Sequence, residues 1–106
     1  MQFKIARWFV GQASSLGDLS ALRYRLSSHA QEEMERRQIS RALVESVLES
    51  PDQIVPERGV VQAYQSQRDI GGKMFLLRVM VDDSVDPAVV VTVYRTTKID
   101  RYWNKP

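Results

Sequence analysis

Apolar and polar positions alternate most clearly along residues 73–81, which read Lys-Met-Phe-Leu-Leu-Arg-Val-Met-Val. Successive side chains of a β-strand point to opposite faces of the sheet, so this stretch predicts a strand with one wholly apolar face. Arg78 belongs to the other face, where its guanidinium needs water, an anion or a carboxylate partner. We therefore expect a central strand that offers a charge on its less covered side. The simpler alternative is that Arg78 lies near an edge and meets solvent or Asp82.

A helical period replaces this alternation earlier in the chain. Ser28 is the predicted N-cap of a helix that ends near Arg37, and Gln31 completes a capping box. Ser40 is the predicted N-cap of a second helix, which ends before Pro51 because proline lacks an N–H group and restricts the residue before it. The apolar face of this second helix consists of Leu43, Val44, Val47 and Leu48.

Strand patterns fill the remainder of the chain, with a short candidate at 22–27 and further strands at 53–55, 60–67, 73–81 and 88–97. Polar turns at 68–72 and 82–87 predict that the later strands form an antiparallel meander. We therefore expect an α+β fold in which a two-helix hairpin packs on one face of a four-stranded antiparallel sheet. Residues 1–22 have an apolar cluster without a clean period and are expected to form an N-terminal extension to a domain of residues 23–106.

Strand parity predicts the composition of the two sheet faces. The face under the helices is expected to contain Val61, Ala63, Phe75, Leu77, Val79, Val89, Val91 and Val93. The opposite, open face is expected to contain Gln62, Tyr64, Ser66, Arg78, Thr92 and Tyr94. This surface would display one guanidinium between two phenols.

Composition narrows the classes of function. The chain has 106 residues, one histidine, no cysteine and a formal net charge of +2, which excludes disulfides, thiolate metal sites and multi-histidine metal sites. No apolar run is long enough to span a membrane and no signal peptide is visible, so we expect a cytoplasmic protein. Residues 1–27 and 94–106 each hold four basic residues and one acidic residue, so both ends could meet a polyanion.

The expected open face suits a phosphodiester. An arginine can fork onto phosphate oxygens, and a tyrosine can stack on a base or donate a proton. RNA can be cut without a metal ion or cofactor when its own 2′-hydroxyl attacks the neighbouring phosphorus. Arg78 would stabilise the developing charge, His29 would act as acid or base, and Tyr94 or Lys98 would supply the other proton transfer. Each residue also has an ordinary structural alternative, such as cross-strand packing of the tyrosines.

Longer motifs carry a resemblance to a known family. The run SHAQEEMERRQIS from Ser28 to Ser40, SPDQI at 50–54 and VTVYRTT at 91–97 resemble a family of short bacterial proteins of unknown function. That family looks related to the RelE-like toxins of toxin–antitoxin pairs. The resemblance implies a metal-independent ribonuclease fold and an antitoxin protein encoded nearby. His29, Arg37 and Tyr94 fall on the recurring polar positions of the family.

Three hypotheses follow from these patterns. The first is a toxin-type endoribonuclease with His29, Arg78, Tyr94 and Lys98 as catalytic residues. Its RNA-binding residues would be Arg37, Tyr64, Arg95, Arg101 and Tyr102. The second is a binding module for RNA or the ribosome that does not cleave, and the third is a protein-interaction domain that uses the apolar arm at 3–10. The sequence leaves the RNA target and the oligomeric state open.

Overall fold

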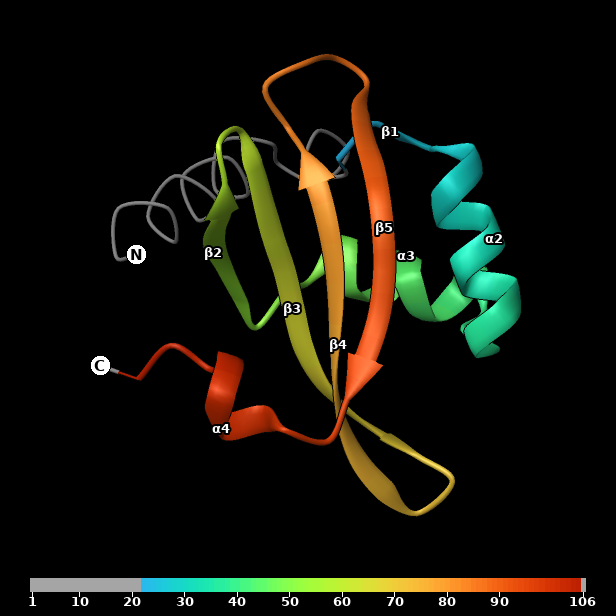
Figure 1. The fold of residues 1–106 in the computed structure, drawn as a ribbon, viewed down its shortest axis with the longest axis vertical. Helices are drawn as coiled ribbons and strands as arrows, with labels where there is room; N and C mark the ends of the chain where they lie inside the picture. Colours follow the sequence, from blue (N-terminus) through green and yellow to red (C-terminus); the bar gives the residue numbers. More distant parts are fainter. Residues whose placement is uncertain (1–21, 106) are drawn as a thin grey trace.

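A five-stranded mixed sheet organises residues 22–105, the part of the chain that the computed structural model describes (Figure 1). In chain order the elements are β1 (Tyr24–Leu26), α2 (Ser28–Arg37), α3 (Arg41–Glu49), β2 (Gln53–Arg58), β3 (Val61–Ile70), β4 (Lys73–Asp82), β5 (Ala88–Thr96) and α4 (Ile99–Tyr102). The strand order across the sheet is β1-β5-β4-β3-β2. The expected extension at 1–22 lies outside the described residues, apart from Leu22.

The predicted four-stranded antiparallel sheet with a helical hairpin is wrong in its strand and helix inventory. β1 is a fifth strand and pairs in parallel with β5, where Leu26 faces Val90, and the short helix α4 follows the last strand. The other three strand pairs are antiparallel. A three-residue strand has no pattern that names its partner, and this partner lies more than sixty residues along the chain. The α+β class itself matches the structure.

Side-chain oxygens begin both longer helices. Ser27, one residue before the predicted cap, accepts a hydrogen bond from the backbone N–H of Ala30 at 3.0 Å. Ser40 caps α3 as predicted and accepts from the N–H of Leu43 at 3.1 Å. Each bond satisfies a donor that the first helical turn leaves without an intrahelical partner.

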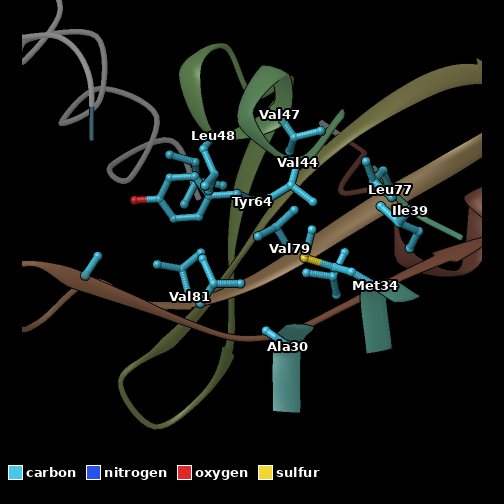
Figure 2. Close-up of a cluster of buried hydrophobic side chains, with 14 residues drawn as sticks. Ala30, Met34, Ile39, Val44, Val47, Leu48, Tyr64, Leu77, Val79 and Val81 are labelled. Atoms are coloured by element: carbon cyan, nitrogen blue, oxygen red, sulfur yellow. The ribbon is translucent and has the colours of Figure 1, made fainter. Parts of the chain in front are cut away.

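The hydrophobic core lies between the sheet and the helix pair α2 and α3. Figure 2 shows Met34 and Ile39 meeting the sheet residues Leu77 and Val79, with Val44 and Val47 above them. These side chains are at most 8% exposed. Complete burial of one such aliphatic side chain contributes roughly 1.5–3 kcal/mol to the stability of the domain.

A two-residue turn sets the register of β3 against β4, and it overturns part of the predicted face assignment. Gly71 and Gly72 have positive φ angles of 63° and 85°, and Tyr64 pairs with Val79, a residue of the helix-covered face. The predicted turn spanned residues 68–72, and the shorter turn moves each β3 side chain to the other face. Tyr64, Gln62 and Ser66 therefore share the parity of the helix-covered face, whereas Val61 and Ala63 point to the opposite face.

A β-bulge at Val91 overturns a second part of that assignment. Met80 pairs with Thr92 and Val81 pairs with Val90, so Val91 has no partner of its own on β4. The extra residue reverses the alternation, and Val90 joins Val93 beneath the helices in place of the predicted Val89 and Val91. Val93, Leu77 and Val79 lie on the predicted side, as do Arg78 and Tyr94 on the other.

The C-terminal segment, residues 98–105, covers part of the sheet face opposite the helix pair (Figure 1). Two glutamine side chains hold it by its backbone. Gln53 donates through Nε2 to the carbonyl oxygen of Asn104 at 2.7 Å and accepts the Asn104 N–H through Oε1 at 3.0 Å. Gln65 donates through Nε2 to the carbonyl oxygen of Tyr102 at 3.2 Å. The sheet face that the sequence predicted to be open is therefore partly covered by residues 98–105 of the same chain.

Candidate functional site

Arg78 lies at the middle of β4, and only 3% of its surface is exposed. Its Nε donates to Gln65 Oε1 at 2.8 Å, its Nη1 donates to the hydroxyl of Tyr94 at 2.7 Å, and its Nη2 meets Glu57 Oε1 at 3.1 Å. Gln65 and Tyr94 flank Arg78 on the neighbouring strands in exact cross-strand register, which follows from the turn and bulge described above. The guanidinium is thus paired with a charge and held by neutral acceptors.

Two aromatic rings complete the surroundings of this guanidinium. The ring centre of Tyr102 lies 4.4 Å from the guanidinium carbon of Arg78, and the ring centre of Tyr94 lies 5.8 Å from it. The two rings meet edge to face, with centres 6.2 Å apart. A cation enclosed by two rings, a carboxylate, a hydroxyl and an amide oxygen is stabilised in place. Arg78 therefore locks the C-terminal segment to the sheet, and its guanidinium is not presented to solvent.

The hydroxyl of Tyr94 stays protonated at neutral pH. Burial raises the pKa of Tyr94 above its ordinary value, and the hydrogen bond from Arg78 only partly opposes this effect. The guanidinium carbon of Arg37 also lies near this ring, 6.0 Å from its centre. Tyr94 thus links the buried Arg78 to the end of α2.

The predicted catalytic set is only partly assembled. Arg78 and Tyr94 come together, but His29 is exposed in the first turn of α2, a helix that packs on the opposite face of the sheet. Lys98 is exposed at the start of the C-terminal segment, and its backbone N–H donates to Thr96 Oγ1 at 3.0 Å. The structure therefore joins two of the four residues through a direct hydrogen bond.

The predicted RNA-binding residues divide into three places. Tyr64 is 3% exposed in the main core, where its hydroxyl donates to Asp83 Oδ2 at 2.8 Å, so it does not share a surface with Tyr94 (Figure 2). Tyr102 packs on Arg78, and the guanidinium carbon of the exposed Arg101 lies 5.5 Å from the centre of the same ring. Arg37 and Arg95 meet at a separate hollow.

This arginine hollow has a volume of about 490 Å³ and opens where the end of α2 approaches β4 and the end of β5. It is lined by Arg36, Arg37, Gln38, Phe75, Arg95, Thr96 and Thr97. The C-terminus of α2 places its residues there, because Gln38 adopts a left-handed conformation and lets the N–H of Ile39 reach the carbonyl of Met34 at 2.8 Å. Arg36 and Arg37 also oppose the partial negative charge of this helix end.

Electrostatic partners fix the cations around the hollow. Glu33 Oε1 lies 2.7 Å from Arg36 Nη2 and 2.7 Å from Arg37 Nε. Hydrogen bonds from Arg36 and then Arg37 lower the pKa of Glu33 to about 2. Arg95 holds its guanidinium carbon 5.1 Å from the ring centre of Phe75. One carboxylate therefore pairs with two of the three guanidinium groups that line the hollow, which leaves an excess of positive charge for an anion.

Sequence reasoning named Arg37 and Arg95 as RNA-binding residues but missed the contributions of Arg36 and Phe75 to the same site. The sequence patterns give Arg36 no role in binding, and they place Phe75 on the sheet face under the helices. The adjacent pair of arginines at a helix end was the available signal for Arg36. No pattern in the sequence indicates that Phe75 lies next to Arg95, because their approach depends on the β4–β5 register.

Two absences among residues 22–105 complete the description. No group of three or more histidine, cysteine, aspartate or glutamate side chains in this range is arranged to hold a metal ion. Of the helices described, none is both long and apolar enough to cross a membrane.

Comparison with known proteins gave one finding. A family model described as a domain of unknown function, DUF4258, matches residues 26–95. The matched region begins at the end of β1 and reaches Arg95 near the end of β5, so it includes Arg36, Arg37 and Arg78. Searches of curated proteins and of solved structures found no significant match.

Proposed function

The chain belongs to the DUF4258 family, and we propose that it binds RNA through the arginine hollow. The observation that carries the proposal is the convergence of Arg36, Arg37 and Arg95 on one open cavity with a single paired carboxylate. Guanidinium groups bind phosphate oxygens through directed, charge-assisted hydrogen bonds. The helix and strand motifs resemble a family of short bacterial proteins that looks related to RelE-like toxins, and this relation supports RNA as the polyanion.

Charge removal within the hollow provides the test. We would measure the anisotropy of a labelled single-stranded RNA against the full-length protein, with excess chelator, between about 50 and 200 mM salt. Arg95→Gln and Arg36→Gln should each weaken binding and reduce the slope of log affinity against log salt by about one.

A matched control removes the same charge elsewhere. Arg23 is exposed, pairs with Asp86 at 3.4 Å, and gives its carbonyl oxygen to the N–H of Ala88 at the start of β5. Arg95 lies seven residues further along that strand, roughly 20 Å away at about 3.3 Å per residue. Arg23→Gln should therefore retain the binding of the unmodified protein. Equal affinity in all three variants would contradict the proposal.

Metal-independent cleavage by a toxin-type endoribonuclease is a second candidate function. The observation in its favour is Tyr94, a phenol whose ring centre lies within 6.0 Å of the guanidinium carbons of both Arg37 and Arg78. A protonated phenol beside a cation can give its proton to the leaving oxygen, while the cation stabilises the phosphorane and solvent water accepts the proton of the attacking 2′-hydroxyl. Within this candidate, Arg37 takes the role expected for Arg78, which is buried and paired.

Product formation distinguishes the two candidates. RNA incubated with the protein in excess chelator should be shortened, Tyr94→Phe should remove the activity, and Tyr24→Phe should retain it because that hydroxyl pairs with Glu45 on α3. Binding without any product supports the binding module and eliminates the enzyme. The toxin role also predicts growth arrest on expression that an antitoxin protein encoded nearby relieves.

A further inference from the structure

The arginine hollow combines two kinds of surface that a simple cation patch lacks. Its α2 side presents Arg36 and Arg37, whereas its sheet side presents the ring of Phe75 with the guanidinium of Arg95 against it. The guanidinium carbon of Arg95 lies 5.1 Å from the ring centre of Phe75, and Phe75 is only partly buried. A ligand that fills the hollow therefore meets charge at one wall and a stacking surface at the other.

From this arrangement we infer that the hollow takes one unstacked nucleotide of single-stranded RNA, an inference that rests on the proposed RNA-binding function. The phosphate lies against Arg36 and Arg37, and the base stacks on the Phe75–Arg95 pair. Aromatic rings and arginine planes are the surfaces on which proteins stack single-stranded bases. The volume of about 490 Å³ falls in the range of about 300–1,000 Å³ that is common for small-molecule sites.

Duplex RNA does not fit the same description. Bases in a duplex are stacked on each other and paired, so a duplex can offer the hollow its phosphates but no free base face. Binding of a duplex would use Arg36 and Arg37 without the Phe75–Arg95 pair. A preference for single strands is therefore the property that separates a nucleotide site from a general backbone site.

The test replaces one base of a short single-stranded RNA by 2-aminopurine, whose fluorescence is quenched on stacking. Unmodified protein should quench it and should bind the single strand more tightly than a duplex of equal length. Phe75→Leu keeps an apolar side chain but removes the ring face, so it should abolish the quenching and weaken single-strand binding about fivefold or more.

Two control variants accompany Phe75→Leu. Phe75→Tyr keeps the ring and should retain both quenching and preference, which separates stacking from a loss of folding. Met74→Leu alters the neighbouring residue, which is 46% exposed on the other face of β4, and should change neither readout.

The possible results separate the nucleotide site from the proposed RNA binding on which it rests. Tight binding without quenching, equal for single strand and duplex and unchanged in Phe75→Leu, overturns the nucleotide site and leaves RNA binding through the arginines intact. Absence of binding by both RNA forms overturns the nucleotide site together with the proposed function. Quenching that persists in Phe75→Leu would place the stacked base elsewhere and also overturns the inference.

Discussion

The guanidinium carbon of Arg78 lies 4.4 Å from the ring centre of Tyr102, so a strand in the middle of the sheet and the C-terminal helix are joined by a cation and an aromatic ring. The contact lies on the face opposite the helix pair, where Gln53 and Gln65 also hold residues 102 and 104 by their carbonyl oxygens. The C-terminal segment is therefore part of the folded domain.

Removing the ring of Tyr102 should destabilise the domain. Tyr102→Ala exposes Arg78 on one side and removes a contact of the kind that contributes up to about 2 kcal/mol when desolvated. With the lost burial, we expect the free energy of unfolding in urea to fall by about 1–3 kcal/mol. Tyr102→Phe keeps the ring and should lose much less. Equal stability of Tyr102→Ala and the unmodified protein would show that the segment adds nothing to the fold.

Arg78 itself should matter for stability and not for RNA affinity. Arg78→Met leaves the Gln65 and Tyr94 oxygens without their buried donor, and one unsatisfied buried polar group costs about 1–3 kcal/mol. Glu57→Gln should cost less than about 1 kcal/mol, because the Glu57 side chain is 41% exposed and its charge is screened. Denaturation and RNA titration of both variants check this. A reduced salt slope for a folded Arg78→Met protein would place Arg78 in the binding site.

The sequence predicted the helices and strands better than it predicted the sheet face on which each side chain lies. The cap at Ser40, the helix-ending Pro51 and the apolar positions of β4 are local signals, and the structure agrees with them. The side on which Tyr64 lies depends on the number of residues in the turn, and the position of Val90 depends on one bulged residue. The turn is three residues shorter than expected and the bulge adds one residue, and apolar alternation records neither change.

For the candidate site, the sequence predicted which residues share a face but not that this face is buried. Arg78 and Tyr94 were placed on one face correctly, because β4 and the second half of β5 follow the simple alternation. The burial of that face was missed because it depends on the C-terminal segment folding back over it. Tyr102, named as an RNA-binding candidate with docking of the tail on the core as its structural alternative, is the residue that covers Arg78. Side-chain type alone does not separate a cation that awaits a ligand from one already enclosed by its own chain.

The turn at Gly71 and Gly72 fixes the register of β3 against β4, and the stability of the domain should be sensitive to substitution at Gly72. Its φ of 85° is a conformation that side chains with a Cβ rarely adopt, although no heavy atom lies within 4 Å of where the Cβ would be. Gly72→Ala should therefore lower the free energy of unfolding by about 1–2 kcal/mol through backbone strain alone. Gly71→Asn should be nearly neutral, because Asn-Gly is a preferred pair for this type of turn. Thermal unfolding of both variants provides the comparison, and a neutral Gly72→Ala would argue against the two-residue turn.

Glu33 should make stability depend on pH in the acid range. Its pKa falls from an ordinary 4.5 to about 2 because Arg36 and Arg37 donate hydrogen bonds to it. A lowered pKa in the folded state means that the stabilising contribution is complete above pH 4.5 and disappears as the pH falls towards 2. The stability advantage of the unmodified protein over Glu33→Gln should therefore shrink across this window. Glu32→Gln, an exposed change of equal charge, should show no such trend, and a constant difference for Glu33→Gln would refute the pairing.

The same carboxylate should also limit the affinity of the arginine hollow for RNA at neutral pH. Glu33 neutralises part of the charge of Arg36 and Arg37, so Glu33→Gln leaves both guanidinium groups available to phosphate. We expect tighter binding in Glu33→Gln, with a steeper dependence on salt because more phosphate charge is neutralised on binding. Glu32→Gln is the control, because it raises the net charge of α2 by the same amount but leaves the ion pairs of Glu33 with Arg36 and Arg37 in place. It therefore measures the effect of the added net charge alone on RNA affinity. Anisotropy titrations that give the two variants the same affinity would mean that the hollow does not contact the RNA.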